Sequence, residues 1–176
     1  MAKLNEIIQW CNQTLKSHEF KDYAPNGLQI EGKPDVNKIL CAVTASQDAI
    51  EAAIEQGADL LLVHHGYFWK GEPYPITGMR GKRIKSLIQH DISLVGYHLP
   101  LDSHPTLGNT DAIPDILEIE NIEALDQSER NPIGNIGYLK QPVSAEEFKL
   151  YVSQRLDFNA IHLPAAKTSI QKIGFC

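Results

Sequence analysis

The sequence is poor in several features that would place it in a familiar class. Basic residues are fewer than acidic residues. The chain has 16 lysines and arginines and 22 aspartates and glutamates, which gives a net charge of −6. That balance argues against broad, nonspecific binding to nucleic acid or to an anionic membrane surface. No apolar run approaches the length of about eighteen residues that a membrane span needs, and the N-terminus lacks the apolar segment of a signal peptide. These absences predict a cytoplasmic protein.

Cysteines and the common catalytic and nucleotide-binding motifs are equally sparse. The three cysteines, Cys11, Cys41 and Cys176, are far apart and form neither a zinc pattern nor a disulfide framework. Cys41 falls inside a predicted apolar strand, which argues against a cysteine nucleophile. The chain contains no G-x-S-x-G nucleophile elbow, no G-x-x-x-x-G-K-[ST] phosphate loop and no G-x-G-x-x-G fingerprint. Any chemistry must therefore come from other residues.

The composition that remains is that of an ordinary globular chain. It is 43% hydrophobic and 22% charged over 176 residues, enough for one domain or for one and part of another. An apolar stripe predicts a helix over residues 3–17. Residues 38–64 read as a buried strand, a helix opened by a Thr44/Gln47 capping box, and a second buried strand. We therefore expect an α/β fold with a mainly parallel sheet flanked by helices.

The second of those strands carries the most informative stretch, residues 59–66. Four consecutive apolar residues lead directly into His64 and His65. In an open α/β sheet the carboxyl end of a strand borders the crevice where ligands bind, and imidazole is the commonest metal ligand in proteins. One buried, hydrogen-bonded histidine beside one exposed histidine would also explain the pair when it is taken alone.

A second strand that ends in a histidine supports the interpretation of the first pair as part of a ligand site. Residues 92–98 read as another strand parallel to it, and this strand ends in His98 and runs directly into Asp102 and His104. Parallel strands present their carboxyl ends at the same edge of a sheet. His98 and Asp102 can therefore converge on the histidine pair, with His104 as a further candidate.

Imidazoles with a carboxylate suit Zn, Mn, Fe, Co or Ni rather than Ca or Mg. Successive side chains of a strand point to opposite faces, so the pair cannot aim at one ion unless the chain turns. Gly66 would permit that turn. Alternatively the pair straddles two ions, with Asp102 binding one ion or bridging both. Two ions roughly 3.5 to 4 Å apart would activate water and hold a hydrolysable group.

Three neighbouring segments leave alternatives open. The aromatic residues of a predicted loop over residues 66–75 would either stack on a planar ligand or pack against the core or a partner subunit. A predicted helix over residues 79–90, with Ile84, Leu87 and Ile88 facing inward, begins with basic residues that fit either a phosphate or a solvated face. Residues 23–32 are rich in turn signals, and Asn26 and Gln29 are either polar contacts near a site or part of a plain loop.

The part of the chain after about residue 130 is expected to begin a second α/β subdomain. Its predicted elements are a strand over residues 133–139, a helix opened by a Ser144/Glu147 capping box, and an apolar strand over residues 169–176. The sequence stops inside that last strand, where soluble domains seldom end, so we expect that a C-terminal portion is missing. The expected organisation is a metal-binding α/β domain over residues 1–128 and an incomplete subdomain over residues 129–176.

Four motifs occurring in one order together resemble a known family. They are residues 22–29, 43–47, 63–71 and 97–105. The chain resembles the YbgI-like proteins, the GTP cyclohydrolase I type 2 homologues of the NGG-interacting-factor superfamily, from about residue 3 to its last residue. The resemblance implies an α/β fold, a dinuclear metal centre and a toroidal homohexamer with the sites facing its interior.

The resemblance also implies a ligand set. It places His64, His65 and Asp102 in the metal site, with two divalent ions in each complete site. By its position, His98 would be a nearby group that contacts either a metal ligand or the substrate. Relatives supply a further histidine and glutamate from a segment that follows the strand over residues 170–176. The expected function is a metal-dependent hydrolase acting on a nucleotide or related small molecule, with His98 or His104 assisting proton transfer. The alternatives are a non-catalytic, ring-forming metal-binding scaffold and a structural fragment without metal.

Overall fold

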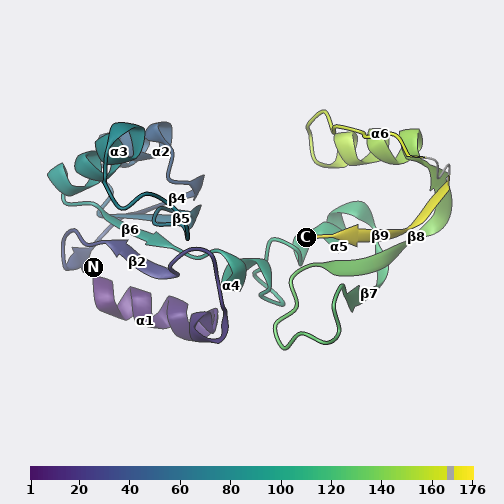
Figure 1. Ribbon diagram of the computed structural model, residues 1–176, viewed down its shortest axis with the longest axis horizontal. Coiled ribbons are helices and arrows are strands. Elements are labelled where there is room, and N and C mark those ends of the chain that lie inside the picture. The colour runs from purple at the N-terminus through teal and green to yellow at the C-terminus, as the bar shows by residue number, and fades with distance from the viewer. Residues whose placement is uncertain (166–168) are drawn as a thin grey trace. The chain divides into compact units, whose positions relative to one another are not determined.

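The computed structural model describes residues 1–165 and 169–176, and the chain divides into two compact units, Met1–Leu101 and Asp102–Cys176 (Figure 1). The expected boundary near residue 128 falls inside the second unit. Residues before and after that point share one core, since Leu117 and Ile119 cluster with Leu139 and Ile173. Both units combine helices with a sheet, so the α/β fold class is confirmed.

The first unit is built around a four-stranded sheet in the order β2-β6-β5-β4. Strands β4 (Ile39–Thr44), β5 (Leu60–His65) and β6 (Ser93–Gly96) are parallel, as predicted. Strand β2 (Gly27–Ile30) joins β6 in the antiparallel direction, which makes the sheet mixed. The turn signals of the 23–32 segment hid this strand, because Gly27, at φ +103°, belongs both to the turn and to the strand's first pair.

Helices cover both faces of this sheet (Figure 1). Helix α1 (Leu4–Thr14) packs on one face, where Leu4 and Cys11 contact Leu60 and Val95 in one apolar cluster. Helices α2 (Gln47–Glu55) and α3 (Gly78–Gln89) cover the other face. The predicted helices are confirmed. The remaining elements of this unit are short: β1 (Ala2–Lys3), a 3-10 turn η1 (Ser17–Glu19) and β3 (Asp35–Val36). The short helix α4 (Leu99–Asp102) begins in this unit and ends at the first residue of the second.

Three details of the first unit differ from expectation. Ile88 faces solvent, with 57% of its surface exposed, rather than joining the inward face of α3. Strand β4 is an edge strand with an exposed face, so the prediction that it is buried is wrong, and Cys41 is exposed. Ser46 rather than Thr44 caps α2, because the Ser46 hydroxyl accepts the Ala49 N–H at 3.1 Å.

The second unit is an antiparallel sheet in the order β7-β8-β9, formed by β7 (Glu120–Ala124), β8 (Asn135–Ser144) and β9 (Ser169–Phe175). Helices α5 (Ala112–Leu117) and α6 (Ala145–Arg155) complete its core. The predicted Ser144/Glu147 capping box is present in both directions. None of the helices in the described residues has the length and apolar character needed to span a membrane.

Candidate metal centre

Three imidazoles meet at the carboxyl edge of the parallel strands. His64 and His65 are the last two residues of β5, and His98 follows the end of β6 by two residues. The pairing of Val63 with Gly96 brings these strand ends together. The ring centroids of His64 and His98 are 5.1 Å apart, and ring nitrogens of all three histidines lie within 4.8 Å of one another. The predicted approach of His98 to the pair is therefore present.

The adjacent histidines share one side of the strand end despite the alternation expected of a strand. Their ring centroids are 4.3 Å apart, with the ring planes tilted by 44°. Gly66 follows immediately, and a Cβ there would lie 2.1 Å from Oε1 of Gln29. A side chain at this position would therefore collide with Gln29, and glycine is what the local packing requires.

The Nδ1 atom of each histidine has a defined neighbour. His64 Nδ1 lies 2.9 Å from the Tyr97 carbonyl oxygen and His98 Nδ1 lies 2.8 Å from Asp22 Oδ1. A carbonyl and a carboxylate only accept hydrogen bonds, so the Nδ1 atom of each of these rings is the donor, which leaves Nε2 as the nitrogen that a metal ion could use. His65 Nδ1 lies 3.2 Å from the hydroxyl of Thr44, which can donate or accept. Metal-binding histidines usually hold their second nitrogen in this way.

The carboxylate beside His98 is buried, with only 3% of the Asp22 side chain exposed. Burial by itself would raise the pKa of Asp22. Hydrogen bonds from His98, Asn26 and the backbone N–H groups of Leu99 and Tyr23 outweigh burial and hold that pKa below its usual value. Asp22 is therefore an ionised, buried carboxylate at neutral pH, and it lies against one of the three imidazoles.

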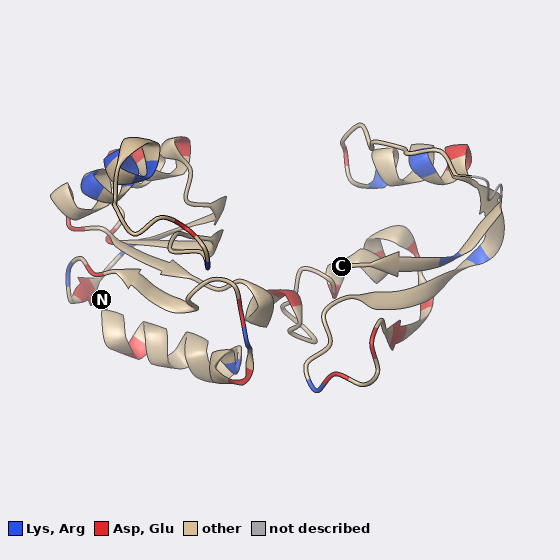
Figure 2. Cartoon of the chain, viewed as in Figure 1, with Lys and Arg blue, Asp and Glu red and all other residues tan. Residues whose placement is uncertain are grey.

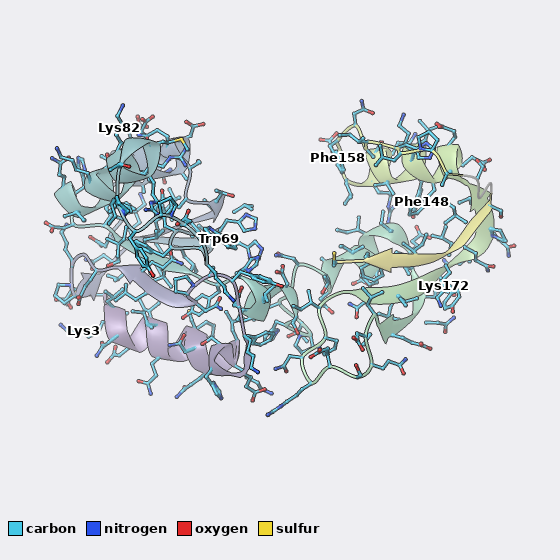
Figure 3. All side chains as sticks on the ribbon, viewed as in Figure 1. Lys3, Trp69, Lys82, Phe148, Phe158 and Lys172 are labelled. Carbon is cyan, nitrogen blue, oxygen red and sulfur yellow. The ribbon has the colours of Figure 1, made fainter. Side chains whose placement is uncertain are left out.

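The aromatic loop lies beside the histidines. The Trp69 ring, labelled in Figure 3, meets His98 edge-on with 4.8 Å between centroids and lies 6.0 Å from His65. Its indole N–H donates to the Gly66 carbonyl at 3.1 Å. Tyr67 instead packs into the core, and its hydroxyl donates to the Ala45 carbonyl at 2.6 Å. Tyr67 thus follows the packing alternative, whereas Trp69 borders the site.

The segment after Asp22 contacts the same edge of the sheet. Asn26 Oδ1 accepts the backbone N–H of His98 at 2.8 Å. Gln29 Oε1 accepts the Tyr67 N–H at 2.7 Å, while its amide nitrogen donates to the Pro25 carbonyl at 2.9 Å. Of the two alternatives for this segment, polar contact near the site is the one observed.

Asp102 and His104, the other two predicted site residues, belong to the second unit. Asp102 is the last residue of α4, and its Oδ1 accepts from the amide of Asn109 at 2.9 Å. His104 Nδ1 accepts backbone N–H groups from the second and third residues after it, at 3.3 and 3.1 Å. The role of Asp102 as a metal ligand stays a prediction from the sequence.

The basic start of α3 (Figure 2) is partly neutralised within the chain. Arg80 donates to Glu72 Oε2 at 2.6 Å and to the Pro75 carbonyl at 3.0 Å. Lys82 and Lys85 face solvent. Arg80 is therefore compensated by a carboxylate, and Lys82 and Lys85 form a solvated part of this face.

Two residues near the histidines escaped prediction as contacts. Asp22 is 76 residues from His98, so no local pattern links them. The spacing of Thr44 and Gln47 predicts a helix cap, although the register pairing of Thr44 with His65 places it beside that imidazole. Pairing the two predicted parallel strands residue by residue is the sequence signal that indicates this contact. Only the tertiary contact reveals Asp22.

Parallel strands that deliver three imidazoles to one sheet edge define an α/β protein with a candidate metal centre. The family model described as Duf34/NIF3 (NGG1p interacting factor 3) matches residues 2–176. The chain belongs to this family, and the resemblance found in its motifs is confirmed.

The relatives agree with this assignment. A protein named GTP cyclohydrolase 1 type 2 homolog from Haemophilus influenzae is 48% identical over 172 residues, covering 97% of this chain and 68% of the relative. A protein of the same name from Neisseria meningitidis is 43% identical, covering 100% of this chain and 70% of the relative. The solved structure of protein ybgI, described as of unknown function, has a TM-score of 0.88 at 41% identity, covering 99% of this chain and 69% of that structure's chain.

Proposed function

We propose that this protein binds a divalent transition metal at the three-histidine edge, with Asp102 adding a carboxylate. The carrying observation is that ring nitrogens of His64, His65 and His98 lie within 4.8 Å of one another. That spacing suits one ion or two neighbouring ions. The accept-only partners of His64 and His98 support the proposal, because they leave Nε2 as the coordinating atom of each ring. Imidazole ligands favour Zn, Mn, Fe, Co or Ni.

We further propose that the bound centre serves hydrolysis of a nucleotide or related small molecule. A divalent metal would supply Lewis acidity and lower the pKa of water there. The protein contributes rings held by their Nδ1 contacts, and it contributes Trp69, which packs edge-on against the His98 ring. The name GTP cyclohydrolase 1 type 2 homolog belongs to the relatives and supports guanine nucleotides as the first substrates to test.

The second candidate is a ring-forming scaffold that binds metal without catalysis, with a homohexamer as the expected assembly. One observation favours self-association. The edge strand β4 exposes Ile39 and Val43 by 43% and 69%, and an apolar edge of this kind is prone to pair with another chain. A cytoplasmic location stays a prediction under either function.

Elemental analysis and chelator competition on the purified chain test metal binding, with His65→Ala compared against His18→Ala. His18 is a matched control because its side chain is 77% exposed. We expect His65→Ala to lower the affinity for Zn²⁺ at least tenfold, because it removes one of the three imidazoles proposed to bind the metal. We expect His18→Ala to bind as the wild type does. A wild type that binds none of the five metals, or a His65→Ala variant with full affinity, would contradict the proposal.

A nucleotide panel then separates the two candidates. Metal-loaded protein is incubated with purine and pyrimidine nucleotides, and products are followed by chromatography. Turnover by the wild type that disappears in His65→Ala while the assembly stays intact supports the hydrolase. A metal-loaded wild type that assembles but turns over no nucleotide supports the scaffold.

A further inference from the structure

We infer that Asp22 is a positioning residue, which fixes the His98 ring so that its Nε2 faces His64 and His65. The distances that carry this inference are 2.8 Å from His98 Nδ1 to Asp22 Oδ1 and at most 4.8 Å between the metal-competent nitrogens of the three histidines. The consequence for metal affinity rests on the proposed function. The consequence for the ring proton does not.

The surroundings of Asp22 require a group that only accepts hydrogen bonds. All of its hydrogen-bond partners in the described residues are N–H donors. Oδ1 accepts from the Tyr23 N–H (2.6 Å), the Ala24 N–H (3.3 Å) and His98 Nδ1 (2.8 Å), and Oδ2 accepts from the Asn26 amide (2.9 Å) and the Leu99 N–H (2.9 Å). An asparagine amide would place N–H against N–H on whichever side it turned. A side chain that only accepts hydrogen bonds at this position therefore places a proton on His98 Nδ1.

The same cluster restrains both the backbone and the ring of His98. Asn26 accepts the His98 backbone N–H through Oδ1 and donates to Asp22 through its amide nitrogen, which closes a small network of three residues. Trp69 packs edge-on against the imidazole from the aromatic loop. A flip of the ring would place a carbon against the buried Oδ1 in place of Nδ1–H, and a lost hydrogen bond to a buried charged group is costly.

Asp59 provides a matched control within the same unit. Its carboxylate is also buried, at 8% exposure, and accepts the backbone N–H groups of Asn37 and Lys38 at 2.9 and 3.3 Å. Lys33 lies 3.6 Å from its other oxygen. Asp59 thus resembles Asp22 in burial and in accepting backbone N–H groups, but the partners of its carboxylate in the described residues are these three neighbours, with no imidazole among them. A purely structural role for Asp22 predicts that Asp22→Asn and Asp59→Asn behave alike.

The experiment reads the His98 ring proton by long-range nitrogen-15 NMR in metal-free protein at about pH 8, above the usual imidazole pKa. We expect the wild type and Asp59→Asn to carry the proton on Nδ1. We expect Asp22→Asn to move it wholly or partly to Nε2. Competition with a chelating dye should show that Asp22→Asn weakens Zn²⁺ binding by about 10- to 100-fold, the usual effect of removing a group that orients a ligand. Asp59→Asn should retain the wild-type affinity.

Two results would overturn the inference. One is a wild-type His98 protonated on Nε2, which can be read even if Asp22→Asn does not fold. The other is a folded Asp22→Asn with an unchanged ring proton or an unchanged Zn²⁺ affinity. A wild type that binds no metal refutes the proposed function, whereas the ring-proton comparison still decides whether Asp22 positions His98.

Discussion

At the scale of single residues, the site depends on glycines that let polar side chains approach. Gln29 occupies the space that a side chain at Gly66 would need, and a Cβ on Gly96 would lie 3.0 Å from the Gln29 amide nitrogen. Gln29 occupies this space and accepts, through Oε1, the N–H of Tyr67, the second residue after His65. The glycines are thus part of the support for the imidazoles rather than incidental turn residues.

Gly66→Ala should therefore destabilise the first unit by about 1 to 3 kcal/mol, because Gln29 must move and leave the Tyr67 N–H without its acceptor. Denaturant unfolding followed by tryptophan fluorescence measures the loss. The double variant Gln29→Ala/Gly66→Ala is the control, since removing Gln29 should remove most of the additional cost of the alanine. Equal costs of Gly66→Ala with and without Gln29 would show that the collision is not the cause.

The three histidines can be predicted from the sequence because each lies at the end of an apolar strand, and parallel strands share an edge. Asp22 cannot be predicted in this way, because its hydrogen bond to His98 joins residues 76 positions apart. A buried aspartate looks like any other aspartate in a turn-rich segment until the fold supplies its donors. Tertiary contacts of this kind have no signature in local spacing.

At the scale of elements, the strands and helices with strong periodicity were predicted and the context-dependent features were not. Strand β2 lies in a segment rich in turn residues, so its sequence does not indicate a strand. Strand β7 is too short and too polar to show the alternation of a half-buried strand. The exposure of β4 follows from its place at the sheet edge, and its apolar sequence gives no sign of that place. An apolar run identifies a strand but does not reveal which of its faces will be covered.

The start of α2 provides an element-scale test. Ser46→Ala should cost about 1 kcal/mol of unfolding free energy, because it removes the acceptor of the Ala49 N–H at the helix N-terminus. Thr44→Val should cost less, since Thr44 lies at the end of β4 and contacts His65 rather than the helix. Denaturant titrations of both variants measure the difference. A larger loss of unfolding free energy in Thr44→Val than in Ser46→Ala would support the Thr44/Gln47 capping box predicted from the sequence.

At the scale of the whole molecule, the chain is two compact units with separate cores, and the candidate histidine cluster lies in the first. Both tryptophans of the sequence, Trp10 and Trp69, also belong to that unit. Tryptophan fluorescence therefore reports on the first unit, because the second unit contributes no tryptophan signal.

This property permits a test of pH-dependent stability. The backbone N–H of Asn37 lowers the pKa of Asp59 most, burial opposes it, and Lys38 and Lys33 lower it further, so that the pKa lies below its usual value. A carboxyl with a lowered pKa in the folded state stabilises that state fully above its unfolded pKa of about 3.9. The contribution disappears as the pH falls through the lower, folded value.

We therefore expect the unfolding free energy of the first unit to decrease between about pH 5 and about pH 3, and to decrease less steeply in Asp59→Asn. At neutral pH the variant should be less stable by about 1 to 3 kcal/mol, because buried N–H donors lose a charged acceptor. Urea titrations at several pH values, read by tryptophan fluorescence, give both quantities. Parallel pH profiles for the wild type and the variant would mean that protonation of Asp59 does not cause the loss of unfolding free energy at low pH. Asp22 and the other carboxylates would then account for the whole slope.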